Sequence, residues 1–154
     1  MDLSDLVTAE RVFPALHAGS KKQVLHDLAA RAGDATGIRA RVIFDALIER
    51  ERLGSTGVGH GIAIPHARLD DMTALKGFFA RLETPIEFDA VDDAPVDLVF
   101  LLLVPEESGA DHLKALARIS RLLRNESVIR ELRAASSAKE IHTALTRPAA
   151  SHAA

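Results

Sequence analysis

The sequence predicts a single-domain α/β sandwich, in which helices cover both faces of a β-sheet. Amphipathic helical patterns occur before and after the strand-like segments, so helices are available for both faces. The run from Val96 to Val104 is almost entirely apolar, which is typical of a central strand buried on both faces. The chain has 154 residues, 47% of them hydrophobic, which suffices for one core. We therefore expect one domain over residues 1–146 and a frayed tail at residues 147–154.

The first strand and the first helix are predicted near the N-terminus. The segment Val12–Leu16 has the composition of a short strand, and Pro14 would restrict that strand to a sheet edge. Ser20 is a suitable N-cap for a helix over about residues 21–32, whose apolar positions fall on one face. The segment Gly33–Gly37 is expected to end this helix.

A second helix is predicted over about residues 39–52, with Gly54 in the position that favours a helix C-terminus. Residues 55–61 form a loop by composition. Residues 62–64 form a short extended piece that Pro65 ends. The chain therefore leads from a helix through a glycine-rich loop to residue 66.

The second half of the chain begins with strands and ends with helices. Strand-like segments at residues 75–82 and, more weakly, residues 85–88 precede the apolar run. The helices that follow are expected at about residues 110–124, at about residues 127–134, and from Ser137 to about Leu145. Apparent capping boxes at Ser108–Asp111 and Ser137–Glu140 favour the starts of the first and last of them.

Composition excludes several classes of function. The formal net charge of −3 argues against a general nucleic-acid binder, which usually carries a basic excess. Cysteine is absent, so disulfides and thiolate metal sites are excluded. The longest apolar run is far shorter than the roughly 20 residues of a membrane span, and the acidic N-terminus lacks the basic start of a signal peptide. We expect a cytoplasmic protein without nucleic-acid binding or membrane insertion.

Residues with the chemistry to bind and accept a phosphoryl group gather between residues 52 and 66. Glycines let backbone N–H groups converge on an anion, hydroxyls add donors, and Arg52 adds a planar charge suited to phosphate oxygens. The predicted phosphate-binding residues are Ser55, Thr56, Gly57, Gly59 and Gly61. His66 follows them, and neutral imidazole is a good phosphoryl acceptor near neutral pH. The alternative is that the glycines only form turns and that His66 is an ordinary loop residue.

Common nucleotide motifs are missing, so a covalent carrier is more plausible than an ATP-dependent enzyme. The chain has neither the Gly-Lys-Ser/Thr triplet of a P-loop nor the dinucleotide pattern Gly-x-Gly-x-x-Gly. His112 is a second candidate, because it begins the helix after the buried strand, where sites of α/β sheets gather; the alternative is a partly buried structural histidine. A zinc site of His60, His66 and His112 is the main rival. Because His-Glu-x-x-His is absent, we expect no metal and no cofactor.

The run from Glu49 to Ala67, ERERLGSTGVGHGIAIPHA, closely resembles the active-site segment of fructose/mannitol-type enzyme IIA proteins of the bacterial phosphotransferase system. Within this family it most resembles the nitrogen-regulatory type. Residues 82–89, 96–105 and 111–113 agree with the family pattern, so the resemblance covers nearly the whole chain. It implies the enzyme IIA fold, a single-domain sandwich with a mixed central β-sheet and helices on both faces.

The resemblance also implies a function and a set of site residues. His66 would be the phosphorylated histidine, His112 its neighbour and Arg52 a phosphate ligand. The chain would be a stoichiometric phosphotransferase component that accepts phosphate from an HPr-like phosphocarrier. Its phosphorylation state would then control regulatory targets of unknown identity, and a weak homodimer is possible. The alternative is a sugar-specific enzyme IIA that hands phosphate to an enzyme IIB. His60 departs from the family pattern, where a small polar residue is expected.

Overall fold

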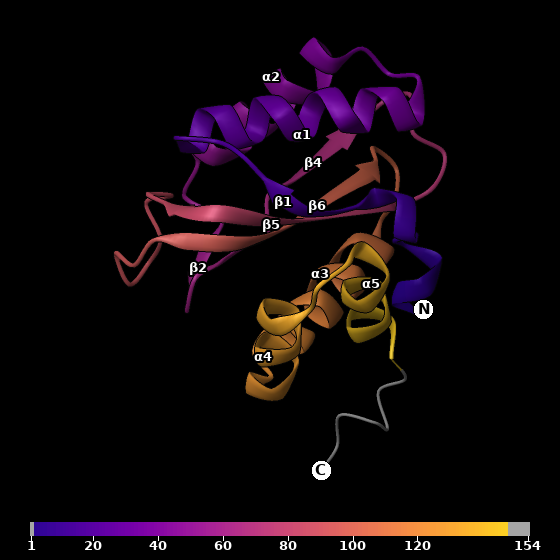
Figure 1. The fold of residues 1–154 in the computed structure, drawn as a ribbon. Coiled ribbons are helices and arrows are strands. Elements are labelled where there is room, and N and C mark those ends of the chain that lie inside the picture. The colour runs from indigo at the N-terminus through magenta and orange to yellow at the C-terminus, as the bar shows by residue number, and fades with distance from the viewer. Residues whose placement is uncertain (1, 148–154) are drawn as a thin grey trace.

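The computed structural model describes residues 2–147. Its centre is a six-stranded sheet with the order β1-β5-β6-β3-β2, and β4 also pairs with β6 (Figure 1). The strands are β1 (Val12–Leu16), β2 (Gly57–Gly59), β3 (Ile62–Ala63), β4 (His66–Leu69), β5 (Lys76–Ile86) and β6 (Val96–Pro105). The helices are η1 (Leu3–Asp5), η2 (Ala9–Arg11), α1 (Lys21–Thr36), α2 (Ala40–Arg52), α3 (Ala110–Leu122), α4 (Glu126–Ala134) and α5 (Ala138–Thr146).

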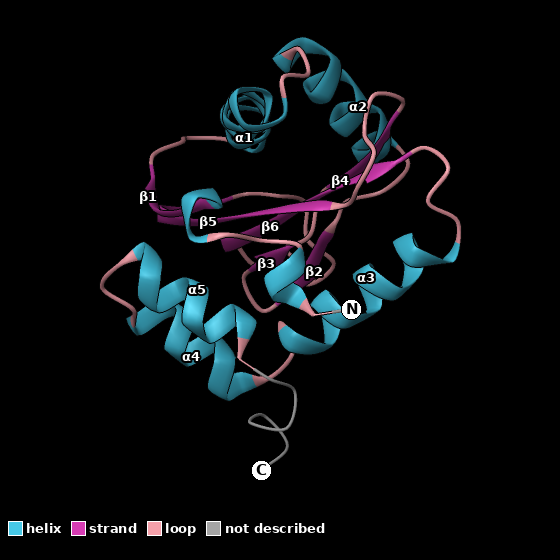
Figure 2. Ribbon diagram, turned by 90° about the vertical axis from the view of Figure 1, so that its right-hand side faces the viewer, coloured by secondary structure: helices cyan, strands magenta, loops and turns pink. Residues whose placement is uncertain are grey.

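The helices form one layer on each face of the sheet. Helices α1 and α2 cover one face, and α3, α4 and α5 cover the other (Figures 1 and 2). Two separate clusters of buried hydrophobic residues correspond to these two interfaces. The prediction of an α/β sandwich with a mixed sheet is therefore confirmed, because β6 pairs antiparallel with β5 and parallel with β3 and β4.

Strand β6 explains why its sequence is apolar without alternation. Successive side chains of a strand point to opposite faces of a sheet. Accordingly, Val99 and Leu101 pack into the core beneath α1 and α2, while Phe100 and Leu102 pack into the core beneath α3, α4 and α5. Both faces of this strand are covered, so both sets of alternating positions must be apolar.

Helix α1 is longer than the sequence predicts. It continues through Gly33 to Thr36, and the left-handed conformation needed to end it is adopted by Gly37, with φ of 79°. Gly33 has a different role. A Cβ atom at this position would lie 2.9 Å from the backbone oxygen of Ile38, so Gly33 permits a close approach of the following segment rather than a turn.

Two strands also differ from expectation. Strand β4 begins directly after Pro65, where the sequence predicts the end of an extended piece. Proline lacks an N–H but still offers a carbonyl, and the carbonyl of Pro65 accepts a hydrogen bond from Leu102 N at 2.9 Å. Strand β5 is continuous from Lys76 to Ile86, because the two predicted segments are joined through an irregularity in the pairing with β6 after Arg81.

Pro14 lies in β1, which among the described strands pairs only with β5 and therefore forms an edge of the sheet, as predicted. Arg81 of β5 connects this edge to α4. Its Nε donates to the carbonyl of Pro14 at 3.0 Å. Its Nη1 donates to the carbonyls of Leu132 at 2.9 Å and Ala135 at 2.6 Å, which lie at the end of α4. One guanidinium thus satisfies helix-terminal carbonyls that have no partner within the helix.

The predicted capping boxes have different outcomes. Ser137 caps α5, because its Oγ accepts from Glu140 N at 3.1 Å. At the start of α3 no side chain caps the helix, and Gly109 precedes it with φ of 58°. The predicted tail falls almost entirely on residues 148–154, outside the described residues. Among residues 2–147, no helix is both long enough and apolar enough to cross a membrane.

Candidate functional site

His66 is the first residue of β4 and pairs with Leu102 of β6. Its ring is oriented by the backbone two residues earlier, where Nδ1 lies 3.0 Å from the carbonyl oxygen of Ile64. A carbonyl only accepts hydrogen bonds, so Nδ1 carries the proton and Nε2 keeps its lone pair. The geometry therefore presents Nε2 as the nucleophilic atom.

Arg50, near the end of α2, is the cation beside this nitrogen. Its Nε donates to Nε2 of His66 at 3.2 Å. Its Nη1 donates to the carbonyl of Gly54 at 2.9 Å, which fixes the guanidinium from the other side. A planar guanidinium held in this position is well suited to phosphate oxygens on Nε2.

Arg52, which the sequence indicated as the phosphate ligand, lies elsewhere. Its Nη1 pairs with Glu49 Oε1 at 2.6 Å, and its side chain is 70% exposed. Helical periodicity explains the correction. The buried residues of α2 are Ile43 and Leu47, and Arg50 follows Leu47 by three positions, on the same face. Arg52 is offset by five positions and points away, so Arg50 replaces it as the candidate phosphate ligand.

His112, in the first turn of α3, lies beside His66. The ring centroids are 5.6 Å apart with an interplanar angle of 59°. Nη2 of Arg68 lies 3.2 Å from Nδ1 of His112. An arginine only donates, so Nδ1 is the acceptor and Nε2 carries the proton. This Nε2 is buried and has no hydrogen-bond partner among residues 2–147. An unsatisfied buried donor is costly, and a phosphate oxygen would satisfy it.

Arg68 was not foreseen from the sequence. Residues two positions apart on a strand point to the same face, so His66 and Arg68 share a side of β4. That signal was available only once β4 was known to be a strand, and Pro65 obscured it.

Burial lowers the pKa of both histidines. For His66 the bond to Ile64 raises the pKa, Arg50 lowers it and Glu51 raises it, but burial is the largest effect and the pKa falls below 6.5. For His112 burial is again first, and His66 and Arg68 lower the pKa further. Both rings are therefore neutral near pH 7, the state in which Nε2 of His66 is nucleophilic.

Ser55 and Thr56 are engaged in the framework around the site. Oγ of Ser55 donates to the carbonyl of Phe88 at 2.7 Å and accepts from Gly57 N at 3.0 Å. Oγ1 of Thr56 donates to the carboxylate of Glu51. Both hydroxyls thus stabilise the segment before His66. The phosphate contacts expected of them from the sequence stay predictions.

The glycines Gly59 and Gly61 do not surround His66. Ile62, which follows Gly61, is paired with Leu98 of β6, and His66 is paired with Leu102. These two positions of β6 are four residues apart, so the glycine segment and His66 are separated by about 13 Å along the strand. Gly61 instead lies against Arg133, where an added Cβ would be 2.4 Å from Nη2. The expected anion-binding loop at His66 is therefore not formed by these two residues.

Gly57 packs elsewhere too, because a Cβ there would lie 2.9 Å from Ala90. His60 belongs to the same glycine-rich end. Its N–H donates to Asp92 Oδ2 at 3.0 Å, and its carbonyl accepts from Arg133. In the described part of the chain, no group of three or more histidine, aspartate or glutamate side chains is positioned to hold a metal ion. The rival zinc site with His66 and His112 is thus not assembled.

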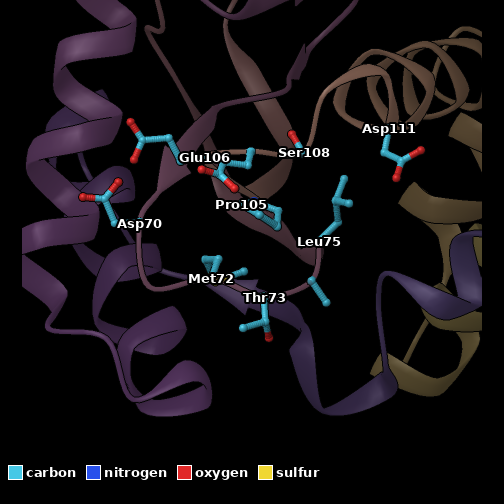
Figure 3. Close-up of a pocket in the computed structure, with 10 residues that line it drawn as sticks. Asp70, Met72, Thr73, Leu75, Pro105, Glu106, Ser108 and Asp111 are labelled. Atoms are coloured by element: carbon cyan, nitrogen blue, oxygen red, sulfur yellow. The ribbon is translucent and has the colours of Figure 1, made fainter.

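An acidic pocket, shown in Figure 3, lies where β4 and β6 end and α3 begins. It has a volume of about 680 Å³, and its lining includes Asp70, Glu106 and Asp111. Arg68 connects it to the histidines, because Nη1 donates to the carbonyl of Glu106 at 3.4 Å while Nη2 contacts His112. One border of the site is therefore negatively charged.

The mixed sheet, its two helical layers and a histidine pair at the end of the central strands define an enzyme IIA of the phosphotransferase type. The chain matches the family described as "Phosphoenolpyruvate-dependent sugar phosphotransferase system, EIIA 2" over residues 5–147 and belongs to it. The resemblance in the sequence is thus confirmed.

Within this family, the relatives indicate the nitrogen-regulatory branch. A nitrogen regulatory protein of Bradyrhizobium diazoefficiens is 52% identical over 153 residues, covering 99% of this chain and 100% of that protein. The crystal structure of IIA-Ntr from Neisseria meningitidis has a TM-score of 0.89 and 33% identity, covering 94% of this chain and 99% of that one. A fructose-specific EIIA component of Haloferax volcanii is 42% identical over 132 residues, covering 86% of this chain and 84% of that protein.

Proposed function

We propose that this chain is a phosphoryl carrier of the nitrogen-related phosphotransferase system, which accepts phosphate on Nε2 of His66 from an HPr-like phosphohistidine protein. The observation that carries the proposal is the orientation of His66. Its Nδ1–H is held by Ile64 O at 3.0 Å, and Nε2 faces a cation, Arg50, at 3.2 Å. Membership of the enzyme IIA family supports the same chemistry.

The transfer step is an in-line displacement at phosphorus. The lone pair of His66 Nε2 forms the new N–P bond, and the electron pair of the breaking N–P bond returns to the donor histidine. Arg50 gives up its bond to Nε2 and contacts the phosphoryl oxygens instead, while His112 Nε2–H donates to another oxygen. Both groups stabilise charge that is largest in the transition state. The step as written uses no metal ion.

The acidic pocket supports a donor with a basic docking surface. Asp70, Glu106 and Asp111 present carboxylates at one border of the site. Opposite charges across an interface accelerate association and fix its register. The association rate with the donor should therefore fall as the salt concentration rises.

The test replaces the acceptor. His66→Ala should take up no phosphate from the phosphorylated HPr-like donor, measured by intact-mass spectrometry, while circular dichroism shows an unchanged fold. The matched control is His17→Ala, since His17 is exposed and its ion pair is with Glu83 on the surface. Undiminished labelling of His66→Ala would place the acceptor on another residue.

In the proposed role, phosphorylation of His66 is the signal to regulatory partners. The phosphoryl group adds roughly 1.5 to 2 negative charges to the site. A partner that buries this surface without a matching cation would bind the unphosphorylated form better. Calorimetric titration of a captured partner against both forms tests this, and equal affinities would show that His66 is not the switch.

Cytoplasmic location and a weak homodimer stay predictions.

A second candidate function is that of a sugar-specific enzyme IIA, which passes phosphate to an enzyme IIB. The Haloferax relative named as a fructose-specific component favours it. The two functions differ in the fate of the phosphate. Rapid transfer from phosphorylated His66 to an enzyme IIB of a sugar permease would support the second function. Retention of the phosphate in the presence of that enzyme IIB would support the first.

A further inference from the structure

We propose that Glu51 is a positioning residue for His66, acting through Thr56 and Ile64 to fix the carbonyl that holds the ring. This inference rests on the proposed function, because it concerns the nucleophile of that reaction. The chain of contacts runs from the end of α2, through the segment before β2, to the residue that orients His66.

The first contact is between a buried carboxylate and Thr56. Glu51 Oε1 accepts from Thr56 N at 3.0 Å, and Oε2 accepts from Thr56 Oγ1. The Glu51 side chain is only 6% exposed, and Thr56 is buried as well. Both donors of one residue therefore converge on one carboxylate, which fixes the position of that residue more tightly than a single bond.

The buried charge of Glu51 is compensated by a cation. Lys21 Nζ lies 2.9 Å from Glu51 Oε1 and is 20% exposed. Lys21 begins α1, so Glu51 ties both helices of this layer to the segment that follows α2. A buried carboxylate without such a partner would be strongly destabilising. The Glu51 carboxylate is thus fixed by Lys21 on one side and by Thr56 on the other.

The second contact passes from Thr56 to the backbone that holds the nucleophile. The carbonyl of Thr56 accepts from Ile64 N at 3.0 Å. The carbonyl of Ile64 accepts from His66 Nδ1–H at 3.0 Å. The two polar backbone groups of Ile64 are therefore both engaged, one toward Thr56 and one toward His66. Displacement of Thr56 would displace the acceptor on which the ring orientation depends.

Glu51 and Arg50 are adjacent on α2 and act on His66 in opposite ways. Arg50 contacts Nε2 directly, whereas Glu51 acts on the Nδ1 side through two other residues. Their charges also oppose each other, because Arg50 lowers and Glu51 raises the pKa of His66. During transfer Arg50 must leave Nε2 for the phosphoryl oxygens. At that moment the bond from Nδ1–H to the Ile64 carbonyl is the ring hydrogen bond that remains within the described part of the chain, so the Glu51 side of the arrangement matters most.

The chain offers a matched control. Glu49 is on the same helix two residues earlier, but its contact is an exposed pair with Arg52. Glu49→Gln removes the same charge from α2 without touching Thr56. Thr56→Val removes the Oγ1 donor, and Thr56→Ser retains it, so this pair separates the hydrogen bond from general packing.

The experiment measures transfer kinetics and the His66 ring in the same variants of the full chain. With a phosphorylated HPr-like donor, Glu51→Gln and Thr56→Val should lower kcat about 10- to 100-fold, the usual cost of losing a partner that orients a reacting group. KM for the donor should change little. Without donor, NMR should show faster solvent exchange of His66 Nδ1–H and a titration midpoint at lower pH. Glu49→Gln should match the wild type in every measurement. Thr56→Ser, which keeps the hydroxyl donor, should show smaller changes than Thr56→Val in each measurement.

The outcomes separate this inference from the proposed function. Folded Glu51→Gln and Thr56→Val variants with wild-type Nδ1–H exchange would overturn the inference, whatever their transfer rates. Altered exchange with unchanged kcat would overturn it too. If Glu51→Gln does not fold, Thr56→Val decides alone. The proposed function is tested separately by phosphate uptake in His66→Ala, because the exchange measurement requires no phosphoryl transfer.

Discussion

The glycine-rich part of the segment between α2 and β4 and the histidine that follows it have different surroundings, although they are close in sequence. At one end, Gly59 and Gly61 are packed against acidic residues and Arg133. At the other end, His66 is held between Arg50 and the carbonyl of Ile64. The glycines are close to His66 in sequence but about 13 Å away along the sheet. Glycines here allow close packing, while the residues of the proposed phosphoryl transfer lie on α2, β4 and α3.

The strongest test of this comparison replaces two arginines of the same helix. Arg50→Ala should slow phosphate uptake by roughly 10²- to 10³-fold, because it removes a preplaced cation from Nε2 of His66. Arg52→Ala should leave the rate near that of the wild type, since Arg52 pairs with Glu49 on the surface. Rapid-quench transfer assays of both variants decide it. If Arg52→Ala slows transfer more than Arg50→Ala does, Arg52 is the phosphate ligand and the assignment to Arg50 is wrong.

His112→Ala should slow transfer by roughly 10²-fold, because it removes a buried donor beside His66. The same assay measures this rate, and thermal denaturation checks that the variant folds. A wild-type rate would make His112 a structural residue only. In that case the site would consist of His66 and Arg50.

At the glycine end, substitution should affect stability and not transfer. Gly61→Ala, at a φ of 81°, places a methyl group where it displaces Nη2 of Arg133 from its bonds to Asp97 and to the carbonyl of His60. Gly37→Ala is the matched control, because its φ of 79° is nearly equal and nothing lies within 4 Å. The left-handed conformation alone costs about 1 to 2 kcal/mol. Gly61→Ala should therefore lose more stability in urea denaturation than Gly37→Ala, with transfer per folded molecule unchanged.

A slow rate in folded Gly61→Ala would contradict the separation of the two ends. It would mean that the contacts of Gly61 with Arg133 and Asp97 are transmitted to His66.

The smallest expected effect is on pH dependence. Burial lowers the pKa of His66 below 6.5. The charged or titratable groups around the histidine pair are Arg50, Glu51, His112 and Arg68. The acidic midpoint of the transfer rate, where Nε2 becomes protonated, should therefore lie below pH 6.5. A rate–pH profile with its acidic midpoint at or above 6.5 would contradict the buried, neutral ring.

The same shifts predict the sign of a stability effect. Both histidines bind protons less readily when folded, so the unfolded state takes up protons first as pH falls below 6.5. Their contribution to stability is fully present above 6.5 and is lost as pH falls through the folded pKa values. Thermal denaturation at pH 7.5 and 5.5 should show that stability decreases less between these two pH values in His112→Ala than in the wild type.

The sequence predicted the layers and the acceptor candidate better than the surroundings of that residue. The apolar run of β6 and the amphipathic helices depend on local periodicity, which a sequence displays directly. The choice between Arg50 and Arg52 also depended on periodicity, and the buried face of Ile43 and Leu47 would have indicated Arg50. The role of Arg68 depended on β4, a strand that forms through pairing with β6 after a proline. Such tertiary pairing has no local signal.

Strand β1 has a consequence for self-association. An exposed strand edge invites another chain to extend the sheet, and proteins block such growth with proline or with side chains that occupy the free groups. Pro14 has no N–H to offer, and its carbonyl already accepts from Arg81. The middle of this five-residue strand therefore cannot supply a regular ladder of hydrogen bonds. A homodimer of this protein that used the β1 edge would have to form through side-chain surfaces, and continuous sheets that extend across β1 are disfavoured even at high concentration.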